Sequence, residues 1–234
     1  MQDGAGENGV PLVFDGPLLI VGGGEVDAGM LAELAGRVGG LVGADRGGDI
    51  LMGAGLVPDA VIGDMDSVAD RTRFPAVTRI VTLSEQDTTD FEKCLYSTRA
   101  PVTLALGMTG GRFDHTLAAL HAVARHASER RIILIDGHDL AIGVAGSVTL
   151  RIGAGERVSI YPLGRTLFAG SKGLLYRLDG LEMAQGQAIG TSNQAIEDVI
   201  EIAVAPGVQD PWLLIVDKGL LGIVLGGWEI GNGR

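Results

Sequence analysis

Leu-Leu-Ile-Val-Gly-Gly-Gly, residues 18–24, is a short apolar run that ends in a glycine turn, and a helix-like stretch from Met30 to Val38 follows it. The same alternation of strand-like and helix-like segments continues to residue 135. The other strand-like segments are Leu41–Ala44, Ala60–Ile62, Arg79–Leu83, Val102–Leu106 and Arg131–Ile135, and the other helical segments lie at Ile50–Met52, Phe91–Thr98 and Thr116–Ser128. Because continuously apolar strands alternate with helices, the first half predicts a parallel sheet covered by helices.

The pattern changes at Asp136–Asp139 (DGHD), which is a turn-forming cluster. Beyond it, glycines interrupt short strand candidates, and long helical periodicity is absent. These candidates are Val148–Ile152, Arg157–Tyr161, Val199–Val204 and Trp212–Val216. Such a succession is typical of a small antiparallel β-domain, either a sandwich or a partial barrel. We therefore expect an α/β domain at residues 1–138 and an all-β domain at residues 139–234.

The composition is that of a globular protein that binds neither nucleic acid nor membranes. Hydrophobic residues make up 46% and charged residues 20% of the 234 positions. The formal net charge of −11 argues against a nucleic-acid partner, because phosphate backbones require a basic face, and against docking on an anionic membrane. An acidic chain can still bind a nucleotide when a metal cation lies between its carboxylates and the phosphates.

Cysteine usage and the first residues predict a cytoplasmic protein. Cys94 is the single cysteine, so an internal disulfide cannot form, which is typical of a reducing compartment. Residues Met1 to Val10 carry acids and glycines without a basic start or an apolar stretch, and this does not fit a signal peptide. The most apolar segment, Trp212 to Trp228, contains Asp217-Lys218 and several glycines, and it is too short to span a bilayer comfortably.

Asp64-Met65-Asp66-Ser67 follows a strand candidate, with Gly63 at the bend. In an α/β sheet, ligands bind to the loops at the carboxyl ends of the strands. Two carboxylates one residue apart in such a loop can share a hard cation. Mg²⁺ fits this arrangement because it takes oxygen ligands and bridges to substrate phosphates. The alternative is a polar turn in which Asp and Ser cap the next segment.

A second acidic segment, Gln86–Glu92 (QDTTDFE), lies at the start of a predicted helix. Thr89 and Glu92 have the spacing of a capping box, and Asp90 in the first turn suits the helix dipole. This structural role does not explain why Asp87 and Asp90 both crowd a helix start that faces another acidic loop. Repulsion among these carboxylates is costly unless a cation intervenes, so the segment favours a shared metal.

The third segment, Thr109–His115 (TGGRFDH), again lies between a strand and a helix. Its paired glycines allow the backbone to approach a ligand closely, and Arg112 can bind phosphate oxygens in bidentate fashion. Asp114 is also placed to N-cap the following helix, which is the alternative to a role in binding. His115 and His121 are expected on the helix face rather than as metal ligands.

Two common phosphate-binding motifs are missing from the sequence. A Walker P-loop requires Gly-Lys followed by Ser or Thr, and none of Lys93, Lys172 and Lys218 follows a glycine. The dinucleotide fingerprint requires a third glycine at position 27, which is occupied by Asp27. Residues 22–24 therefore predict a tight turn and only weakly indicate contact with a bound nucleotide.

In this order and spacing, the three segments resemble the thiamine pyrophosphokinase family. Ala44–Gly47 (ADRG) is similar to an early Ala-Asp-Gly-Gly element of that family, and Thr191–Gln194 (TSNQ) is similar to the Ser-Asn element of its C-terminal domain. The resemblance covers residues 41 to 120 and, beyond them, one short motif. It implies a Rossmann-like parallel sheet with flanking helices, followed by a β-sandwich domain, in a homodimer.

The resemblance also implies an activity. Members of the family transfer the β,γ-diphosphate of ATP to the hydroxyl of thiamine with Mg²⁺ and release AMP, so ATP and thiamine are the expected partners. One alternative is another Mg²⁺-dependent nucleotide phosphotransferase with a different acceptor alcohol. The other is a non-catalytic thiamine- or nucleotide-binding protein, which a missing acid in one of the motifs would mark. No acid is missing.

Carried over by position, the resemblance gives each motif a role. Asp64, Asp66 and Asp90 are expected to hold Mg²⁺, with Asp45 and Asp87 as acidic neighbours. Together with Arg112, these three ligands are expected to form the catalytic group. The residues expected to bind ATP are Asp45, Thr89, Gly110, Arg112 and Asp114. The residues expected to bind thiamine are Gln86, Ser192 and Asn193.

Overall fold

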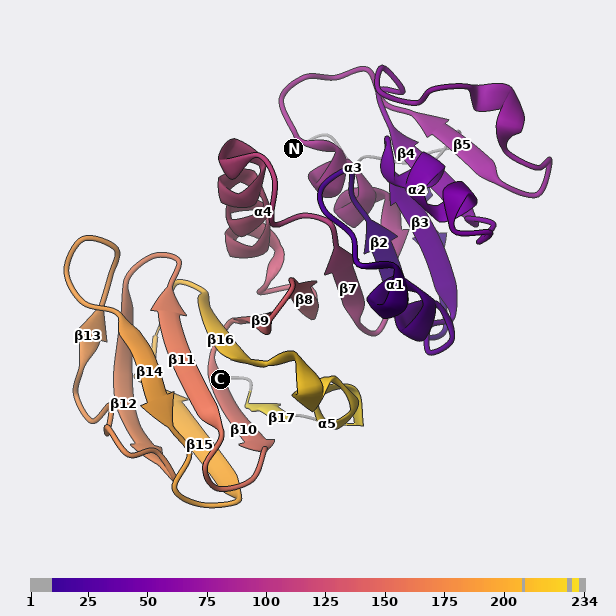
Figure 1. The fold of residues 1–234 in the computed structure, drawn as a ribbon. Helices are drawn as coiled ribbons and strands as arrows, with labels where there is room; N and C mark the ends of the chain where they lie inside the picture. Colours follow the sequence, from indigo (N-terminus) through magenta and orange to yellow (C-terminus); the bar gives the residue numbers. More distant parts are fainter. Residues whose placement is uncertain (1–9, 208, 227–228, 232–234) are drawn as a thin grey trace. The chain divides into compact units, whose positions relative to one another are not determined.

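The computed structural model describes residues 10–207, 209–226 and 229–231, and the chain forms two compact units (Figure 1). The first unit consists of Met1–Ala122 with Ile132–Asp136, and the second consists of Val123–Arg131 with Gly137–Arg234. The fold is mixed α/β: most helices belong to the first unit, whereas strands dominate the second.

A parallel sheet organises the first unit. Its strands are β2 (Leu18–Val21), β3 (Gly40–Ala44), β4 (Ala60–Gly63), β5 (Arg79–Thr82), β7 (Thr103–Leu106) and β8 (Ile132–Ile135). They lie in the order β8-β7-β2-β3-β4-β5, and each neighbouring pair is parallel. The chain first adds β3, β4 and β5 on one side of β2 and then returns to add β7 and β8 on the other. All carboxyl ends therefore meet at one edge of the sheet, where α/β folds bind ligands.

Local signals set the helices of this unit. They are α1 (Ala28–Ala35), α2 (Gly47–Gly53), α3 (Asp90–Ser97) and α4 (Phe113–His126), together with the short 3-10 helix η1 (Arg71–Arg73). The Asp27 side chain caps α1 by accepting a hydrogen bond from the backbone N–H of Met30 at 2.7 Å. α3 begins with a capping box between Thr89 and Glu92, as the sequence predicted. Two further short strands, β1 (Leu12–Val13) and β6 (Thr98–Arg99), pair in parallel apart from the main sheet.

Most strands of the first unit's sheet are buried on both faces. Every residue of β2, β4, β7 and β8 is buried, as expected for apolar parallel strands covered by helices. The apolar side chains of α1 and α3 are buried as well, among them Leu31, Leu34, Phe91 and Leu95. Each large side chain buried in this way contributes about 1.5–3 kcal/mol. The burial holds the strand ends, and with them the loops, in fixed positions.

The second unit contains two antiparallel sheets. One has the order β14-β11-β16-β9, with β9 at Asp139–Val144, β11 at Arg157–Pro162, β14 at Gly190–Gln194 and β16 at Trp212–Asp217. The other has the order β13-β12-β15-β10-β17, with β10 at Ser147–Arg151, β12 at Thr166–Lys172, β13 at Glu182–Met183, β15 at Val199–Val204 and β17 at Glu229–Gly231. Helices η2 (Lys218–Leu220) and α5 (Leu221–Gly226) follow β16.

Side chains of the two sheets meet in the interior of the second unit. Phe168 of β12 and Trp212 of β16 form an edge-to-face pair, with ring centroids 5.4 Å apart and an interplanar angle of 79°. Both side chains are 0% exposed, and the indole N–H of Trp212 donates to the carbonyl of Gly146 at 3.1 Å. The largest aromatic side chain of this interior therefore has its single polar group satisfied.

The predicted strands and helices of the first half are present close to their expected positions, whereas several strands of the second half were missed. β9 begins at Asp139, inside the cluster read as a turn. β14 has the polar sequence GTSNQ, which has little intrinsic preference for strands. It forms at the edge of its sheet because its backbone pairs with β11. Tertiary pairing thus overrides local preference at both places.

Within the described ranges, no helix is long and apolar enough to cross a membrane. The signal-peptide expectation rests on residues 1–9, which lie outside the described residues, as does Trp228 at the end of the apolar segment.

Candidate active site

Two acidic residues follow neighbouring parallel strands at the carboxyl edge of the sheet. Ala44 of β3 lies opposite Ile62 of β4, and the backbone N–H of Asp45 donates to the Ile62 carbonyl at 2.9 Å. Asp64 directly follows Gly63, the last residue of β4. A Cβ atom on Gly63 would lie only 2.9 Å from the Asp45 Cβ, so the absence of a side chain there lets the acids approach each other.

An unusual turn presents Asp64 and Asp66 on the same side of the loop. Between them, Met65 has a φ of 66°, a left-handed conformation that costs a non-glycine residue about 1–2 kcal/mol. Its side chain is 3% exposed and packs with Val61 and Phe74, which opposes that cost. The backbone N–H of Asp66 donates to the Asp64 carboxylate at 3.1 Å, which closes the turn. A buried methionine thus holds two acids at the surface.

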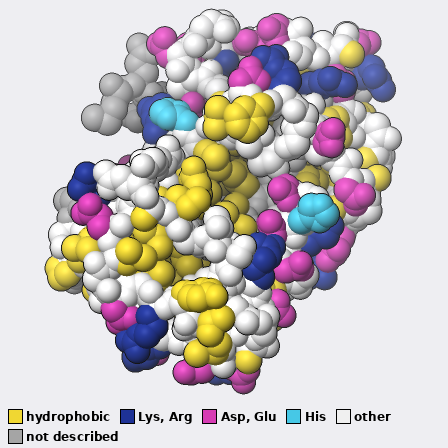
Figure 2. All heavy atoms as spheres, turned by 60° about the vertical axis from the view of Figure 1, so that its left-hand side comes forward, with side chains coloured by type: hydrophobic (Ala, Val, Ile, Leu, Met, Phe, Trp, Pro, Cys, Tyr) yellow, Lys and Arg dark blue, Asp and Glu magenta, His cyan; other side chains and the backbone are white. Residues whose placement is uncertain are grey.

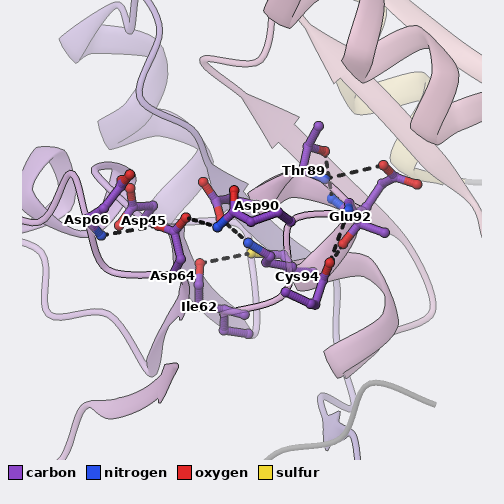
Figure 3. A network of polar contacts seen from close by, with 12 residues as sticks. Asp45, Ile62, Asp64, Asp66, Thr89, Asp90, Glu92 and Cys94 are labelled. Atoms are coloured by element: carbon purple, nitrogen blue, oxygen red, sulfur yellow. Dashed lines mark hydrogen bonds and ion pairs between the residues drawn. The ribbon is translucent and has the colours of Figure 1, made fainter. Parts of the chain in front are cut away.

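Three carboxylates form a group with the dimensions of a metal site (Figure 3). Asp45, Asp64 and Asp66 each offer one oxygen, and these oxygens all lie within 4.8 Å of one another. Asp45 is 4% exposed, and its Oδ1 has no hydrogen-bond partner among the described residues, whereas its Oδ2 accepts from the backbone N–H of Ser67 at 3.2 Å. A buried carboxylate oxygen without a partner is costly, and a cation would satisfy it. Because all three donors are oxygens, the group fits a hard ion such as Mg²⁺.

Asp90, which the resemblance included among the metal ligands, lies beside this group but outside it. Its Oδ1 forms an ion pair with the Lys93 amino group at 3.2 Å, and the Lys93 side chain is only 2% exposed. Figure 3 shows Asp90 next to Asp64 at the start of α3. Among the described residues, the three acids whose oxygens lie within 4.8 Å of one another are therefore Asp45, Asp64 and Asp66, and Asp90 lies beside them with the buried Lys93 as its ion-pair partner.

The electrostatics of the acids differ with their surroundings. Burial, and then the nearby Asp90 carboxylate, raises the pKa of Asp45 above its usual value. Burial also raises the pKa of Asp90, although Lys93 opposes this effect. At Asp64, the hydrogen bond from the Gln86 side chain, followed by that from the Asp66 backbone, lowers the pKa. Asp45 is thus the acid whose negative charge is least well compensated by the chain itself.

The loop between β5 and α3 brings Gln86 to this group. The Gln86 Nε2 donates to the Asp64 Oδ2 at 3.1 Å, so the residue expected to bind thiamine contacts a candidate metal ligand. Thr89, expected to bind ATP, uses its hydroxyl to accept the Glu92 backbone N–H at 3.3 Å in the capping box. The hydroxyl of Thr89 therefore already has a structural role.

The loop after β7 carries the candidate phosphate-binding residues. Gly110 and Gly111 have φ values of 75° and 72°, a conformation that strongly favours glycine. The Arg112 guanidinium pairs with the Asp114 carboxylate through two hydrogen bonds, of 3.1 Å and 2.6 Å. Both side chains are well exposed, at 71% and 63%. Such an exposed pair contributes little stability, so Arg112 can exchange Asp114 for another anion.

The triple glycine after β2 has a structural explanation. The backbone N–H of Gly22 donates to the Leu106 carbonyl at 2.8 Å, and that of Gly24 donates to the Gly107 carbonyl at 3.0 Å. These glycines therefore join the end of β2 to the end of β7. The chain bends at residues 23–24, and the tight turn predicted from the sequence stays a prediction.

Ser192 and Asn193, expected to bind thiamine, belong to β14 in the second unit. Ser192 is exposed and has a φ of 59°. Asn193 is 4% exposed, and its side chain is used within the unit: Oδ1 accepts from the backbone N–H of Tyr176 at 2.9 Å, and Nδ2 donates to the Tyr176 carbonyl at 2.7 Å. The Asn193 amide thus anchors the segment that carries Tyr176, whose side chain is 65% exposed.

Apolar side chains reach the surface around Tyr176. Leu175, Tyr176 and Ile196 are each about half exposed or more, at 49%, 65% and 52%. The backbone links these segments, since the N–H of Leu175 donates to the Gln194 carbonyl and that of Ile196 to the Gly173 carbonyl. Figure 2 shows hydrophobic side chains gathered in patches on the face that its view brings forward. An exposed aromatic ring held by a buried amide is suited to stack on a flat ligand.

Sequence reasoning gave secondary roles to residues that are central in the structure. Asp45 was expected to bind ATP, although its place after β3 and the place of Asp64 after the neighbouring β4 could have suggested the same ion. The sequence shows that Lys93 does not belong to a P-loop, but its spacing from Asp90 also permits an i,i+3 ion pair, and that pair was not predicted. Tyr176 had no sequence signal beyond its aromatic character.

Comparisons with known proteins agree on one family. Residues 32–135 match the family model described as thiamin pyrophosphokinase, catalytic domain. The chain is 30% identical to a thiamine pyrophosphokinase of Oryza sativa subsp. japonica, with 62% of each chain covered. It is 32% identical to one of Arabidopsis thaliana, with 62% of this chain and 61% of the relative covered.

Solved structures agree with the sequence comparison. The crystal structure of thiamin pyrophosphokinase from Geobacillus thermodenitrificans superimposes with a TM-score of 0.72 at 25% identity, covering 86% of this chain and 97% of that one. The chain spans about three fifths of the length of the rice and Arabidopsis relatives, at 62% and 61%. The family model, the relatives and the solved structures to which this chain is similar all carry the name of the thiamine pyrophosphokinase family.

Proposed function

We propose that this chain, a member of the thiamine pyrophosphokinase family, transfers a diphosphate group from ATP to the hydroxyl of thiamine and forms thiamine diphosphate and AMP. The observation that carries the proposal is the group of Asp45, Asp64 and Asp66, which lies within the residues matched by the family's catalytic domain. These acids lie at the carboxyl edge of a parallel sheet, where α/β enzymes bind their substrates.

Mg²⁺ is the proposed cofactor, held by Asp45, Asp64 and Asp66. When bound, it supplies charge neutralisation and orientation to a polyphosphate undergoing in-line displacement. Asp64 is oriented from two sides, because Gln86 donates to one of its oxygens and the Asp66 backbone donates to the other. We propose Asp90 as a neighbouring acid that keeps its charge through Lys93, in place of the ligand role expected from the sequence.

The phosphates of ATP are proposed to contact the loop after β7. Arg112 is exposed, and its carboxylate partner Asp114 is only two residues away, so both can rearrange without disturbing the core. The left-handed backbone at Gly110 leaves no side chain between the loop and a ligand. Thr89 is proposed to contribute to the ATP site through the helix start that it caps.

Candidate residues for thiamine recognition are proposed in each unit taken by itself. Gln86 is proposed through its place beside Asp64, and Ser192 through its exposed, left-handed position. We assign Asn193 an indirect role, because its amide is occupied by the backbone of Tyr176. The Tyr176 ring is the proposed platform for the flat heteroaromatic part of thiamine. Tyr176→Ala should weaken thiamine binding while leaving ATP binding unchanged.

The broader expectations from the sequence accompany this proposal. They are a Rossmann-like catalytic domain at residues 1–138, a β-sandwich domain at residues 139–234, a homodimer and a cytoplasmic location. The single Cys94 supports the last, since it is buried and cannot pair within the chain. Burial raises the pKa of the Cys94 thiol well above its usual value, so this cysteine is also a poor nucleophile.

Product analysis tests the proposal. The chain is incubated with ATP, Mg²⁺ and thiamine, and the nucleotide product is identified by ³¹P NMR. We expect AMP to form only when thiamine is present. Formation of ADP would indicate a different phosphotransferase, and thiamine binding without turnover would indicate a non-catalytic binding protein. Either result would overturn the proposal.

Asp66→Asn tests the metal group within the same assay. This change keeps the size of an exposed side chain but removes its charge, so we expect the fold to persist and AMP formation to fall by about 10²-fold or more. Asp198→Asn, a change of the same kind at an exposed acid of the second unit, is the control and should be neutral. Near-normal AMP formation by Asp66→Asn would remove Asp66 from the site.

A further inference from the structure

The Glu85 carboxylate collects four hydrogen bonds at the start of the loop that carries Gln86 and leads to Asp90. Its Oε2 accepts from the backbone N–H groups of Asp87 and Thr88, at 2.9 Å and 3.0 Å. Its Oε1 accepts from the hydroxyl of Thr88 and, at 2.6 Å, from the hydroxyl of Tyr96. A carboxylate offers about four acceptor positions, so the acceptor capacity of Glu85 is filled by the chain itself.

These bonds fold the loop on itself and tie it to α3. Three of the donors belong to Asp87 and Thr88, which immediately follow Gln86. The fourth belongs to Tyr96, near the end of α3, so Glu85 ties the loop back to the helix that follows it. Gln86 lies between Glu85 and Asp87 in the sequence, and its side chain extends to Asp64. The capping box at Thr89 then fixes the turn into α3.

We propose that Glu85 is a positioning residue that holds Gln86 against Asp64 and so sets the metal affinity of the acidic group. The inference rests on the proposed function for its metal, and it adds a residue that neither the motifs nor the comparisons assign. Glu85 acts through Gln86, whose amide orients one oxygen of Asp64. Partners that orient metal ligands in this way commonly change metal affinity by about 10–100-fold when they are altered.

Glu85 is suited to hold the loop rather than to bind the ion. Although burial acts against it, its hydrogen bonds keep the pKa of Glu85 below its usual value, so it remains an anion at neutral pH. Burial and the bond to Glu85 raise the pKa of Tyr96 to about 12, so the phenol remains a donor over the same range. The anchor therefore keeps its charge pattern at neutral pH.

A direct metal titration separates positioning from simple stabilisation. Glu85→Gln replaces one acceptor oxygen by an NH₂ group, which faces hydrogen-bond donors, so about half of the anchor is lost. Tyr96→Phe removes one donor and leaves the other three. Glu33→Gln is the matched control. Glu33 is half exposed on α1 and forms an ion pair with Arg37, just beyond the end of that helix. Mn²⁺ alone is titrated into each purified full chain and followed by electron paramagnetic resonance, together with thermal unfolding without metal.

We expect the Mn²⁺ dissociation constant of Glu85→Gln to rise about tenfold, and that of Tyr96→Phe to rise less, while Glu33→Gln matches the wild type. In the AMP assay, the Mg²⁺ concentration for half-maximal rate should rise in the same order, with kcat at saturating Mg²⁺ nearly unchanged. A purely structural role would lower the unfolding temperature and leave the dissociation constant unchanged.

The inference is overturned if Glu85→Gln binds Mn²⁺ within twofold of the wild type, or if the wild type binds no Mn²⁺. If Glu85→Gln does not fold, Tyr96→Phe decides in the same way: weaker binding supports the inference, and unchanged binding overturns it. The proposed function fails separately, because a wild-type chain that binds Mn²⁺ but forms no thiamine-dependent AMP would leave the role of Glu85 intact.

Discussion

The close packing around Gly63 gives the sharpest prediction for the acidic group. A Cβ atom at this position would lie 2.9 Å from the Asp45 Cβ and 3.0 Å from the Asp90 Oδ1, whereas ordinary contact begins at 3.4 Å. Gly63→Ala therefore requires shifts of 0.5 Å and 0.4 Å, the differences from 3.4 Å. The Gly63 φ is not in the left-handed region, so the backbone itself accepts alanine. The whole effect of the change must come from displacement of the two acids.

Overpacking of this kind costs about 1–3 kcal/mol of folding free energy. A displacement of 1 Å in a catalytic group can cost about 10²-fold in rate, so a shift of half that size corresponds to about tenfold. We expect Gly63→Ala to lower the free energy of unfolding measured in urea and to weaken Mn²⁺ binding about tenfold, because Asp45 is one of the proposed ligands.

Gly53→Ala is the matched control for this change. No atom outside the local helix lies within 4 Å of a Cβ placed on Gly53, near the end of α2. Alanine there should stabilise the helix by about 0.5–1 kcal/mol and leave metal binding unchanged. If Gly63→Ala kept both wild-type stability and wild-type Mn²⁺ affinity, the packing described for Asp45 and Asp90 would be incorrect.

Two further predictions concern the strained and charged residues beside Gly63. The pKa of Asp45 is raised in the folded state. The stability that its protonation contributes is therefore fully present below the usual pKa of 3.8 and is lost as the pH rises through the folded-state pKa. Asp45→Asn should therefore increase the urea stability of the metal-free chain at pH 7 but not at pH 3, and abolish stabilisation by Mg²⁺; a less stable variant at pH 7 would contradict this. Met65 has a φ of 66°, so the free energy of unfolding of Met65→Gly should exceed that of Met65→Ala by about 1 kcal/mol, whereas alanine is usually the more stable of the two. Equal urea midpoints for the two variants would refute the strain.

Much of the fold could be predicted because the first unit is locally consistent. Apolar runs such as Leu18–Val21 and Ala60–Gly63 are fully buried strands, and the capping residues mark the start of α3. The second unit was harder, because β14 is a polar edge strand whose pairing with β11 is set by tertiary structure. Strand propensity depends on such context more than helix propensity does.

The candidate site was predictable in its motifs but not in its pairings. The sequence placed acidic loops at strand ends, but it could not show that the buried Lys93 lies against Asp90, while Asp45 joins Asp64 and Asp66. That choice depends on the register of β3 against β4, which the sequence does not state. The fourfold anchoring of Glu85 was also missed, since it depends on the shape of one loop.

Several unfavourable features of the first unit lie at the acidic group. Among the described residues, the non-glycine positions with a positive φ are Asp45, Met65 and Ser192. Asp45 belongs to the acidic group, and Met65 lies between its other two members. Asp45 also combines burial, a neighbouring negative charge and an oxygen without a partner. A chain selected for stability alone would not keep three costs in one place. A cation that binds only the folded state would offset them, by about 2.7 kcal/mol at a hundred times its dissociation constant. The unfavourable features of the metal-free site are thus the physical counterpart of the metal affinity proposed for it.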